Sequence, residues 1–204
     1  MLKIAVFVSG RGSNFQAIVD AIASGIIKAQ INAVFTDKDL CGAIEIADKN
    51  LIPVYKISNL EKPGFYSYNV ITELLYKHSI DLVVLAGFLK KIPDSVVEEY
   101  KNKIINIHPA LLPSFGGAGM YGMNVHRAVF NSSAKVSGAT VHFVDKVYDN
   151  GRIIAQEAVD ISDVKSPEEI AERVLKTEHR LLPFVIKKIS EGKVEIIDNR
   201  VIVH

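Results

Sequence analysis

Short apolar runs rich in valine and isoleucine alternate with amphipathic stretches, and this alternation limits the fold more than any other feature of the sequence. The apolar runs cover residues 4–8, 31–35, 54–57, 82–86 and 104–107. The amphipathic stretches lie near residues 15–23, 43–49, 66–78 and 94–100. Short apolar strands of this kind are typical of sheets covered on both faces. The pattern therefore predicts an α/β fold with a Rossmann-like, mostly parallel twisted sheet and helices on both faces.

The pattern changes after Pro113. Residues 114–123 are rich in glycine and have no periodicity, which is typical of a mobile surface loop. Two longer strands are predicted over residues 136–144 and 152–161. We therefore expect a mixed C-terminal half that completes the sheet.

A long helix is predicted to start at Ser166, because the sequence Ser-Pro-Glu-Glu combines a capping box with a proline at the first helical position. This helix should run to about residue 188, with a bend at Pro183. Residues 194–203, two apolar runs separated by Asp198-Asn199, predict a small hairpin.

The composition excludes several classes of protein. The net charge is +1 and the basic residues are scattered, so neither a nucleic-acid surface nor a membrane-binding face is expected. Cys41 is the only cysteine, which excludes an intrachain disulfide and a cysteine metal cluster, and we interpret it as a small structural thiol. The first apolar run is too short to cross a bilayer and leads directly into a glycine-rich turn, unlike a signal peptide. We expect a soluble, cytoplasmic protein without a metal.

The turn Ser-Gly-Arg-Gly-Ser-Asn at residues 9–14 follows the first predicted strand. Such a turn presents backbone N–H groups and a helix N-terminus to an anion. Phe15 stands where a dinucleotide-binding motif needs its third glycine, and no Gly-Lys-Ser/Thr follows, so a monophosphate suits this turn better. The alternative is a purely structural turn, in which Ser13 and Gln16 form a capping box.

The segment Asn-Ile-His-Pro at residues 106–109 ends an apolar strand with polar groups. Asn106 and His108 are two residues apart, so their side chains face the same way in an extended chain, and Pro109 keeps His108 extended. A histidine can move a proton near neutral pH, and an asparagine amide can donate to a developing oxyanion. The alternative is a solvated strand end with a hydrogen-bonded imidazole.

A second polar group follows the strand predicted at residues 136–144. Asp149 precedes Asn150-Gly151 and is either a plain turn residue or a carboxylate that orients His108 and keeps it charged. His142 lies in the middle of the strand, and we interpret it as a structural histidine. The spacing of the histidines and aspartates does not suggest a zinc site.

These segments together resemble the glycinamide ribonucleotide formyltransferase branch of the folate-dependent formyltransferase superfamily. The resemblance covers nearly the whole chain. It rests on the turn at residues 8–14, on Val-Val-Leu-Ala-Gly-Phe at 83–88, on Asn-Ile-His-Pro-Ala-Leu-Leu-Pro at 106–113, on residues 138–151, and on Thr-Glu-His at 177–179. It implies a single formyltransferase domain over residues 1–204, with a nucleotide- and phosphate-binding half (1–110) and a folate-loop and C-terminal half (111–204).

The resemblance also implies a reaction and its participants. The chain would transfer a formyl group from 10-formyltetrahydrofolate, as co-substrate, to the amino group of glycinamide ribonucleotide in purine biosynthesis. It would act as a monomer or a homodimer. Direct attack would pass through a tetrahedral intermediate, with a catalytic trio of Asn106, His108 and Asp149.

The remaining implied site residues fall into three groups. The acceptor's phosphate would be bound by Arg11, Gly12, Ser13 and Asn14. Its amine and ribose would be contacted from the long helix by Leu175, Lys176, Thr177 and Glu178. The folate would be flanked by Leu89, Lys90, Lys91, Ile92, Asn106, Asp145, Lys146, Val147, Tyr148 and Asp149.

Three other functions are possible for a chain with these features. In a formyl-folate hydrolase, water would replace the amine, but such enzymes usually carry an extra N-terminal domain, and here the first strand begins at Leu2. A transfer-RNA formyltransferase would normally need a basic C-terminal domain, and this sequence stops at His204. A non-catalytic nucleotide-binding module is disfavoured by the missing third glycine and by the polar trio.

Overall fold

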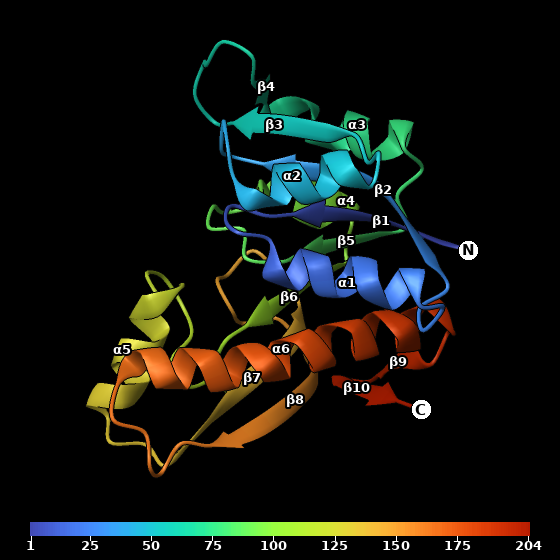
Figure 1. The fold of residues 1–204 in the computed structure, drawn as a ribbon. Coiled ribbons are helices and arrows are strands. Elements are labelled where there is room, and N and C mark those ends of the chain that lie inside the picture. The colour runs from blue at the N-terminus through green and yellow to red at the C-terminus, as the bar shows by residue number, and fades with distance from the viewer. The chain divides into compact units, whose positions relative to one another are not determined.

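A computed structural model describes every residue from Met1 to His204 as two compact units, which we call the N-terminal unit (Met1–Ile105) and the C-terminal unit (Asn106–His204). The boundary falls inside strand β6 (Ile104–His108), whereas the resemblance implies a division after residue 110. Figure 1 shows the elements of both units.

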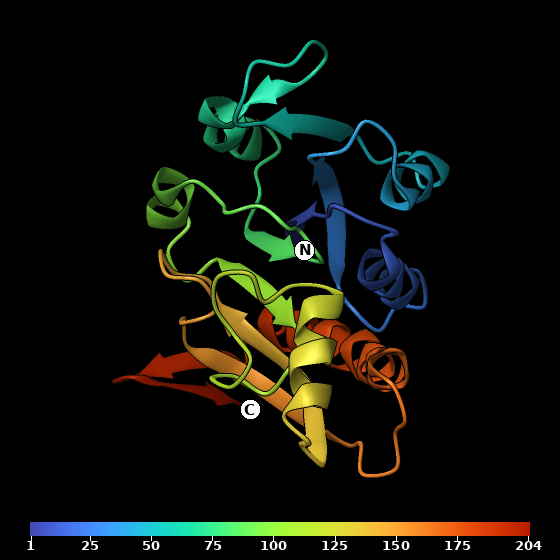
Figure 2. The same cartoon turned by 90° about the vertical axis from the view of Figure 1, so that its left-hand side faces the viewer.

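The N-terminal unit contains a parallel sheet with helices on both faces. Its strands are β1 (Leu2–Phe7), β2 (Ala29–Thr36), β3 (Val54–Ser58), β4 (Tyr66–Ser67) and β5 (Leu82–Leu85), in the spatial order β4-β3-β2-β1-β5. Its helices are α1 (Ser13–Ala23), α2 (Gly42–Lys49), α3 (Ile71–Lys77) and α4 (Asp94–Glu99). Figure 2 shows α1 and α2 on one face of this sheet and α3 and α4 on the other. The predicted parallel architecture is confirmed.

Aromatic side chains fill the centre of the N-terminal unit. Phe7 on β1 stacks on Phe35 on β2 with ring centroids 4.5 Å apart, and both rings are fully buried. Phe15 on α1 is also fully buried, together with Ile18 one turn further along the helix. Phe15 therefore packs in the core at the position where a dinucleotide-binding turn would need a glycine.

The structure contradicts one alternative and shortens one predicted element in the N-terminal unit. Helix α1 begins directly after Gly12, which has a left-handed backbone (φ 81°), and no side chain caps the helix, so Ser13 and Gln16 do not form a capping box. Instead, the Gln16 amide donates to Asp20 at 2.7 Å. The amphipathic stretch at 66–78 is a helix only from Ile71, because its first residues form β4 and the 3-10 turn η1 (Tyr68–Val70).

The C-terminal unit combines an antiparallel strand pair with the longest helix of the chain. Its strands are β6, β7 (Val136–Phe143) and β8 (Ile153–Asp160), in that spatial order, with β7 and β8 antiparallel. Its helices are α5 (Met123–Asn131) and α6 (Pro167–Ser190), and α6 packs on both β7 and β8. A hairpin of β9 (Val194–Ile197) and β10 (Arg200–Val203) closes the chain.

The mixed C-terminal half, its two long strands, its capped helix and its hairpin are all confirmed. The Ser166 hydroxyl accepts a hydrogen bond from the Glu169 backbone N–H at 3.3 Å, as the capping box predicts. The helix continues through Pro183 to Ser190. Helix α5 was not predicted, because a single short helix after a glycine-rich loop carries little periodic signal.

Candidate active site

The turn after β1 is held tightly by neighbouring backbone. A Cβ on Gly12 would lie 3.0 Å from Cα and Cβ of Ala43, in addition to the strain of its left-handed conformation. A Cβ on Gly42 would lie 2.7 Å from the Arg11 carbonyl oxygen. Glycine at these two positions therefore lets the start of α2 pack directly against the turn, and the N-terminus of α1 emerges next to an exposed Arg11.

The same turn is connected to the segment after β5. The backbone N–H of Leu89 donates to the Ser9 hydroxyl at 3.0 Å, and the Ser9 N–H donates to the Gly87 carbonyl at 3.0 Å. Of the predicted folate-flanking residues here, Ile92 is buried, whereas Leu89 is 44% exposed. Lys91 pairs with Asp94 at 2.8 Å. The structure thus brings these residues next to the glycine-rich turn through Ser9, which sequence reasoning had not assigned a role.

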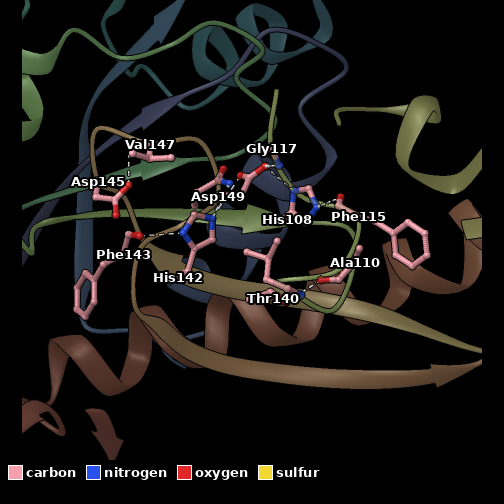
Figure 3. A network of polar contacts seen from close by, with 12 residues as sticks. His108, Ala110, Phe115, Gly117, Thr140, His142, Phe143, Asp145, Val147 and Asp149 are labelled. Atoms are coloured by element: carbon pink, nitrogen blue, oxygen red, sulfur yellow. Dashed lines mark hydrogen bonds and ion pairs between the residues drawn. The ribbon is translucent and has the colours of Figure 1, made fainter. Parts of the chain in front are cut away.

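Asn106, His108 and Asp149 lie together in the C-terminal unit. The Nδ1 atom of His108 is 3.6 Å from a carboxylate oxygen of Asp149, within ion-pair distance. The other ring nitrogen of His108, Nε2, donates to the Phe115 carbonyl at 2.8 Å. Both ring nitrogens of His108 therefore face oxygen atoms that can accept a hydrogen bond. Figure 3 shows His108 between Asp149 and Phe115.

Asp149 is held in place by backbone geometry. It has a left-handed conformation (φ 54°), which aspartate tolerates better than most residues. The Gly117 N–H donates to one of its carboxylate oxygens at 2.9 Å. A Cβ on Gly151 would lie 1.8 Å from the Phe143 carbonyl oxygen. Only glycine therefore allows the chain to pass this close to the end of β7 before β8 begins. Asp149 is therefore both a turn residue and the carboxylate partner of His108.

His142 belongs to the same cluster, although sequence reasoning assigned it a structural role only. Its side chain is 2% exposed, its Nδ1 donates to the Phe143 carbonyl at 2.8 Å, and its Nε2 is 3.1 Å from Asn106 Nδ2. Burial lowers the pKa of His142, and the hydrogen bond to Phe143 together with Asp149 opposes this shift. An irregularity in the β7–β8 register between Val141 and His142 marks the position, but the sequence carries no sign of it.

Thr140 anchors the segment that follows His108. Its hydroxyl donates to the Ala110 carbonyl at 2.6 Å and accepts from the Leu112 N–H at 3.1 Å. The Gln156 amide donates to the same hydroxyl at 3.0 Å. A Cβ on Gly138 would lie 2.2 Å from the Glu157 carbonyl oxygen. The pattern Gly-x-Thr-Val-His therefore has a physical explanation. Gly138 allows close packing on β8, Thr140 anchors residues 110–112, and His142 contacts Asn106.

His126 on α5 is buried within reach of the charge of His108. It is 6% exposed, and its Nδ1 has no hydrogen-bond partner. Burial, followed by the charge of His108, lowers the pKa of His126 to about 4. His126 is therefore neutral at physiological pH.

The predicted acceptor-binding residues on α6 differ in exposure. Thr177 and Glu178 are buried, at 1% and 8% exposure, whereas Lys176 is exposed. In the loop after β7, Val147 and Tyr148 are 61% and 48% exposed. The Asp145 carboxylate accepts from the Val147 N–H at 2.8 Å, which orders this loop locally. No group of three or more histidine, cysteine, aspartate or glutamate side chains is arranged to bind a metal ion.

A histidine paired with a carboxylate beside an asparagine amide, on an α/β fold, is an arrangement that can stabilise an oxyanion in a group-transfer reaction. The formyl transferase family model matches residues 2–186. The chain belongs to this formyl transferase family.

Several of its relatives carry the name phosphoribosylglycinamide formyltransferase. A chloroplastic enzyme of this name from Arabidopsis thaliana is 44% identical over 95% of this chain, which spans 67% of that protein. The Bacillus subtilis enzyme is 39% identical over 93% of this chain and 95% of its own length. A crystal structure of the enzyme from Anaplasma phagocytophilum superposes with a TM-score of 0.89 at 33% identity, covering 99% of this chain and 93% of that one.

These comparisons confirm the predicted family, fold and enzyme class. None of the helices has the combination of length and apolar character that crossing a membrane requires.

Proposed function

We propose that this chain transfers the formyl group of 10-formyltetrahydrofolate to the amino group of glycinamide ribonucleotide, a step of de novo purine biosynthesis. The observation that carries the proposal is the juxtaposition of Asn106, His108 and Asp149 in a member of the formyl transferase family. The enzymes named phosphoribosylglycinamide formyltransferase that resemble this chain support the choice of acceptor. We expect the reaction to take place in the cytoplasm, with the chain as a monomer or homodimer.

The three residues have distinct roles in this proposal. The acceptor amine attacks the formyl carbon, and negative charge develops on the formyl oxygen. The charged His108 and the Asn106 amide stabilise that oxygen by donating hydrogen bonds to it. Asp149, 3.6 Å from His108 Nδ1, orients the imidazole and places a carboxylate beside it. Protons then pass from the amine to the leaving folate nitrogen through water or His108, and no covalent enzyme intermediate is needed.

The contact between His108 and Phe115 has a consequence for this mechanism. In the structure, the Phe115 carbonyl occupies the hydrogen-bonding direction of His108 Nε2 at 2.8 Å. A substrate oxygen that uses this donor has to replace the carbonyl as its acceptor. The proposed reaction therefore requires the segment around Phe115 to shift when the substrates bind.

The substrate-binding residues form three proposed groups. The turn Arg11, Gly12, Ser13 and Asn14 binds the acceptor's phosphate through backbone N–H groups, the α1 N-terminus and the Arg11 charge. The acceptor's ribose and amine are contacted by Leu175, Lys176, Thr177 and Glu178. The folate is contacted by Leu89, Lys90, Lys91, Ile92, Asn106, Asp145, Lys146, Val147, Tyr148 and Asp149.

An assay with glycinamide ribonucleotide and 10-formyltetrahydrofolate tests the proposal by following the deformylated folate. We expect product only when the acceptor is present, and a loss of about 10²–10⁴ in kcat in His108→Ala. The control is His204→Ala, which changes an exposed histidine in the terminal hairpin region and should keep full turnover.

Two outcomes would contradict the proposal. Folate product formed without any acceptor would instead indicate a formyl-folate hydrolase. An intact fold with unchanged turnover in His108→Ala would show that the cluster does not carry the chemistry.

A further inference from the structure

The hydrogen bonds of His142 define its tautomer. A backbone carbonyl can only accept, so Nδ1, 2.8 Å from the Phe143 oxygen, carries a hydrogen. The Nε2 atom then faces the Asn106 amide nitrogen at 3.1 Å, and an amide nitrogen can only donate. Both contacts are satisfied together by a neutral imidazole with Nδ1–H and a lone pair on Nε2.

Some neighbours of His142 favour its neutral form and others favour its charged form. Asp149 lies 3.7 Å from Nε2, and it and Asp145 favour a charged ring, whereas the neighbouring His108 disfavours it. Burial at 2% exposure is the dominant influence and lowers the pKa of His142. His142 therefore stays a neutral acceptor beside Asp149, the carboxylate that is paired with His108.

An amide nitrogen has two hydrogens, and the contact to His142 engages one of them. This contact fixes the plane of the Asn106 amide and decides which end of it faces the ring. The second N–H is left to donate to an oxyanion. If the amide were turned over, its carbonyl oxygen would take that place and repel the developing negative charge.

We propose that His142 is a positioning residue that keeps the Asn106 amide oriented with its nitrogen as the oxyanion donor. This role rests on the proposed formyl transfer and deepens it, because it names the residue on which Asn106 depends. His142 acts through Asn106 and touches neither substrate. Protonating His142 would convert its acceptor nitrogen into a donor and release the amide.

The kinetic test compares His142→Phe, which removes the acceptor, with His142→Gln, whose amide oxygen can accept from Asn106. Losing one oxyanion donor costs about 10²–10³ in kcat, so we expect His142→Phe to lose about 10- to 100-fold in kcat, with KM values changed less than about threefold. His142→Gln should recover most of this loss. Ser137→Ala, at another buried polar side chain on β7, is the control and should keep parental kcat.

A double-mutant cycle separates positioning from general structural support. If His142 acts through Asn106, then Asn106→Ala should cost much less in the His142→Phe background than in the parent. Independent, multiplicative losses, or equal losses in His142→Phe and His142→Gln, would overturn the proposal.

A spectroscopic test does not depend on turnover. Long-range ¹H–¹⁵N spectra of the parent chain at neutral pH should show His142 as the neutral Nδ1–H tautomer, and His142→Phe should shift the Asn106 side-chain amide signals. A protonated ring or an Nε2–H tautomer would overturn the proposal even if formyl transfer is confirmed. Correct tautomer and amide shifts without any formyl transfer would instead contradict the proposed function and leave the positioning contact standing.

Discussion

At the scale of single residues, the candidate site depends on polar side chains that hydrogen-bond to backbone groups. Thr140 is the clearest case, because one fully buried hydroxyl contacts the Ala110 carbonyl, the Leu112 N–H and the Gln156 amide. The segment it anchors follows His108 directly, so its position affects where the imidazole lies.

We expect Thr140→Val to lower both stability and activity. The shape of the side chain is retained, but a buried carbonyl and a buried N–H lose their partner, which costs about 1–3 kcal/mol each when no water replaces it. Urea denaturation should show the loss of stability, and steady-state kinetics should show a lower kcat. Thr36→Val is the matched control, since Thr36 is equally buried in the N-terminal unit and accepts from the Lys38 N–H. A Thr140→Val enzyme with parental kcat would contradict the anchoring role.

At the scale of elements, the ends of α6 are set by different chemistry. At its start, the Ser166 hydroxyl accepts from Glu169 N–H, Pro167 occupies the first helical position, and Glu168 and Glu169 lie in the first turn. At its end, Lys187 and Lys188 lie in the last turn. Both arrangements match the helix dipole, and they hold in place the helix that carries Thr177 and Glu178.

Ser166→Ala should destabilise the chain by about 1 kcal/mol, because the capping hydrogen bond is lost and an N–H at the helix start has no partner. Ser166→Asp should restore most of this stability, since aspartate caps helices well and its charge suits the helix N-terminus. The midpoint of urea denaturation measures both effects. Ser190→Ala, at the opposite end of α6, is the control. Equal midpoints for Ser166→Ala and the parent would show that the cap contributes nothing.

At the scale of the whole molecule, buried histidines make stability depend on pH. The pKa of His126 is lowered to about 4 by burial, whereas an unfolded histidine titrates near 6.5. Between these values, the unfolded chain binds a proton that the folded chain excludes. The free energy of unfolding therefore falls as the pH drops from about 6.5 to about 4.

His126→Leu should remove this part of the acid sensitivity. We expect the parent to lose about 1–2 kcal/mol more than the variant between pH 7 and pH 5, because the variant has no proton to take up at this position on unfolding. Urea denaturation at a series of pH values measures the difference. Ser137→Ala is the control, since Ser137 is buried but has no titratable group. Parallel pH curves for parent and His126→Leu would contradict the assignment.

Local sequence determined much of this protein. The apolar runs, the Ser166 capping box and the terminal hairpin depend on periodicity and turn chemistry within a few residues, and the structure confirms them. The period of two along an extended chain also predicted that Asn106 and His108 act together. The residues left Asp149 as either a plain turn residue or a carboxylate for His108. The resemblance to formyltransferases favoured the second role, and the structure places Asp149 beside His108.

Only the tertiary structure decided the rest, because the contacts involved join residues of different elements and loops. Helix α1 has Gly12 at its N-cap and no capping side chain. Gly12 has a left-handed backbone, and a Cβ there would lie only 3.0 Å from Ala43. His142 joins Asn106 across neighbouring strands, and Phe115 reaches His108 through a loop without periodicity. Sequence spacing records which face of a strand a residue takes, but only packing determines which partner from another strand or loop meets it there.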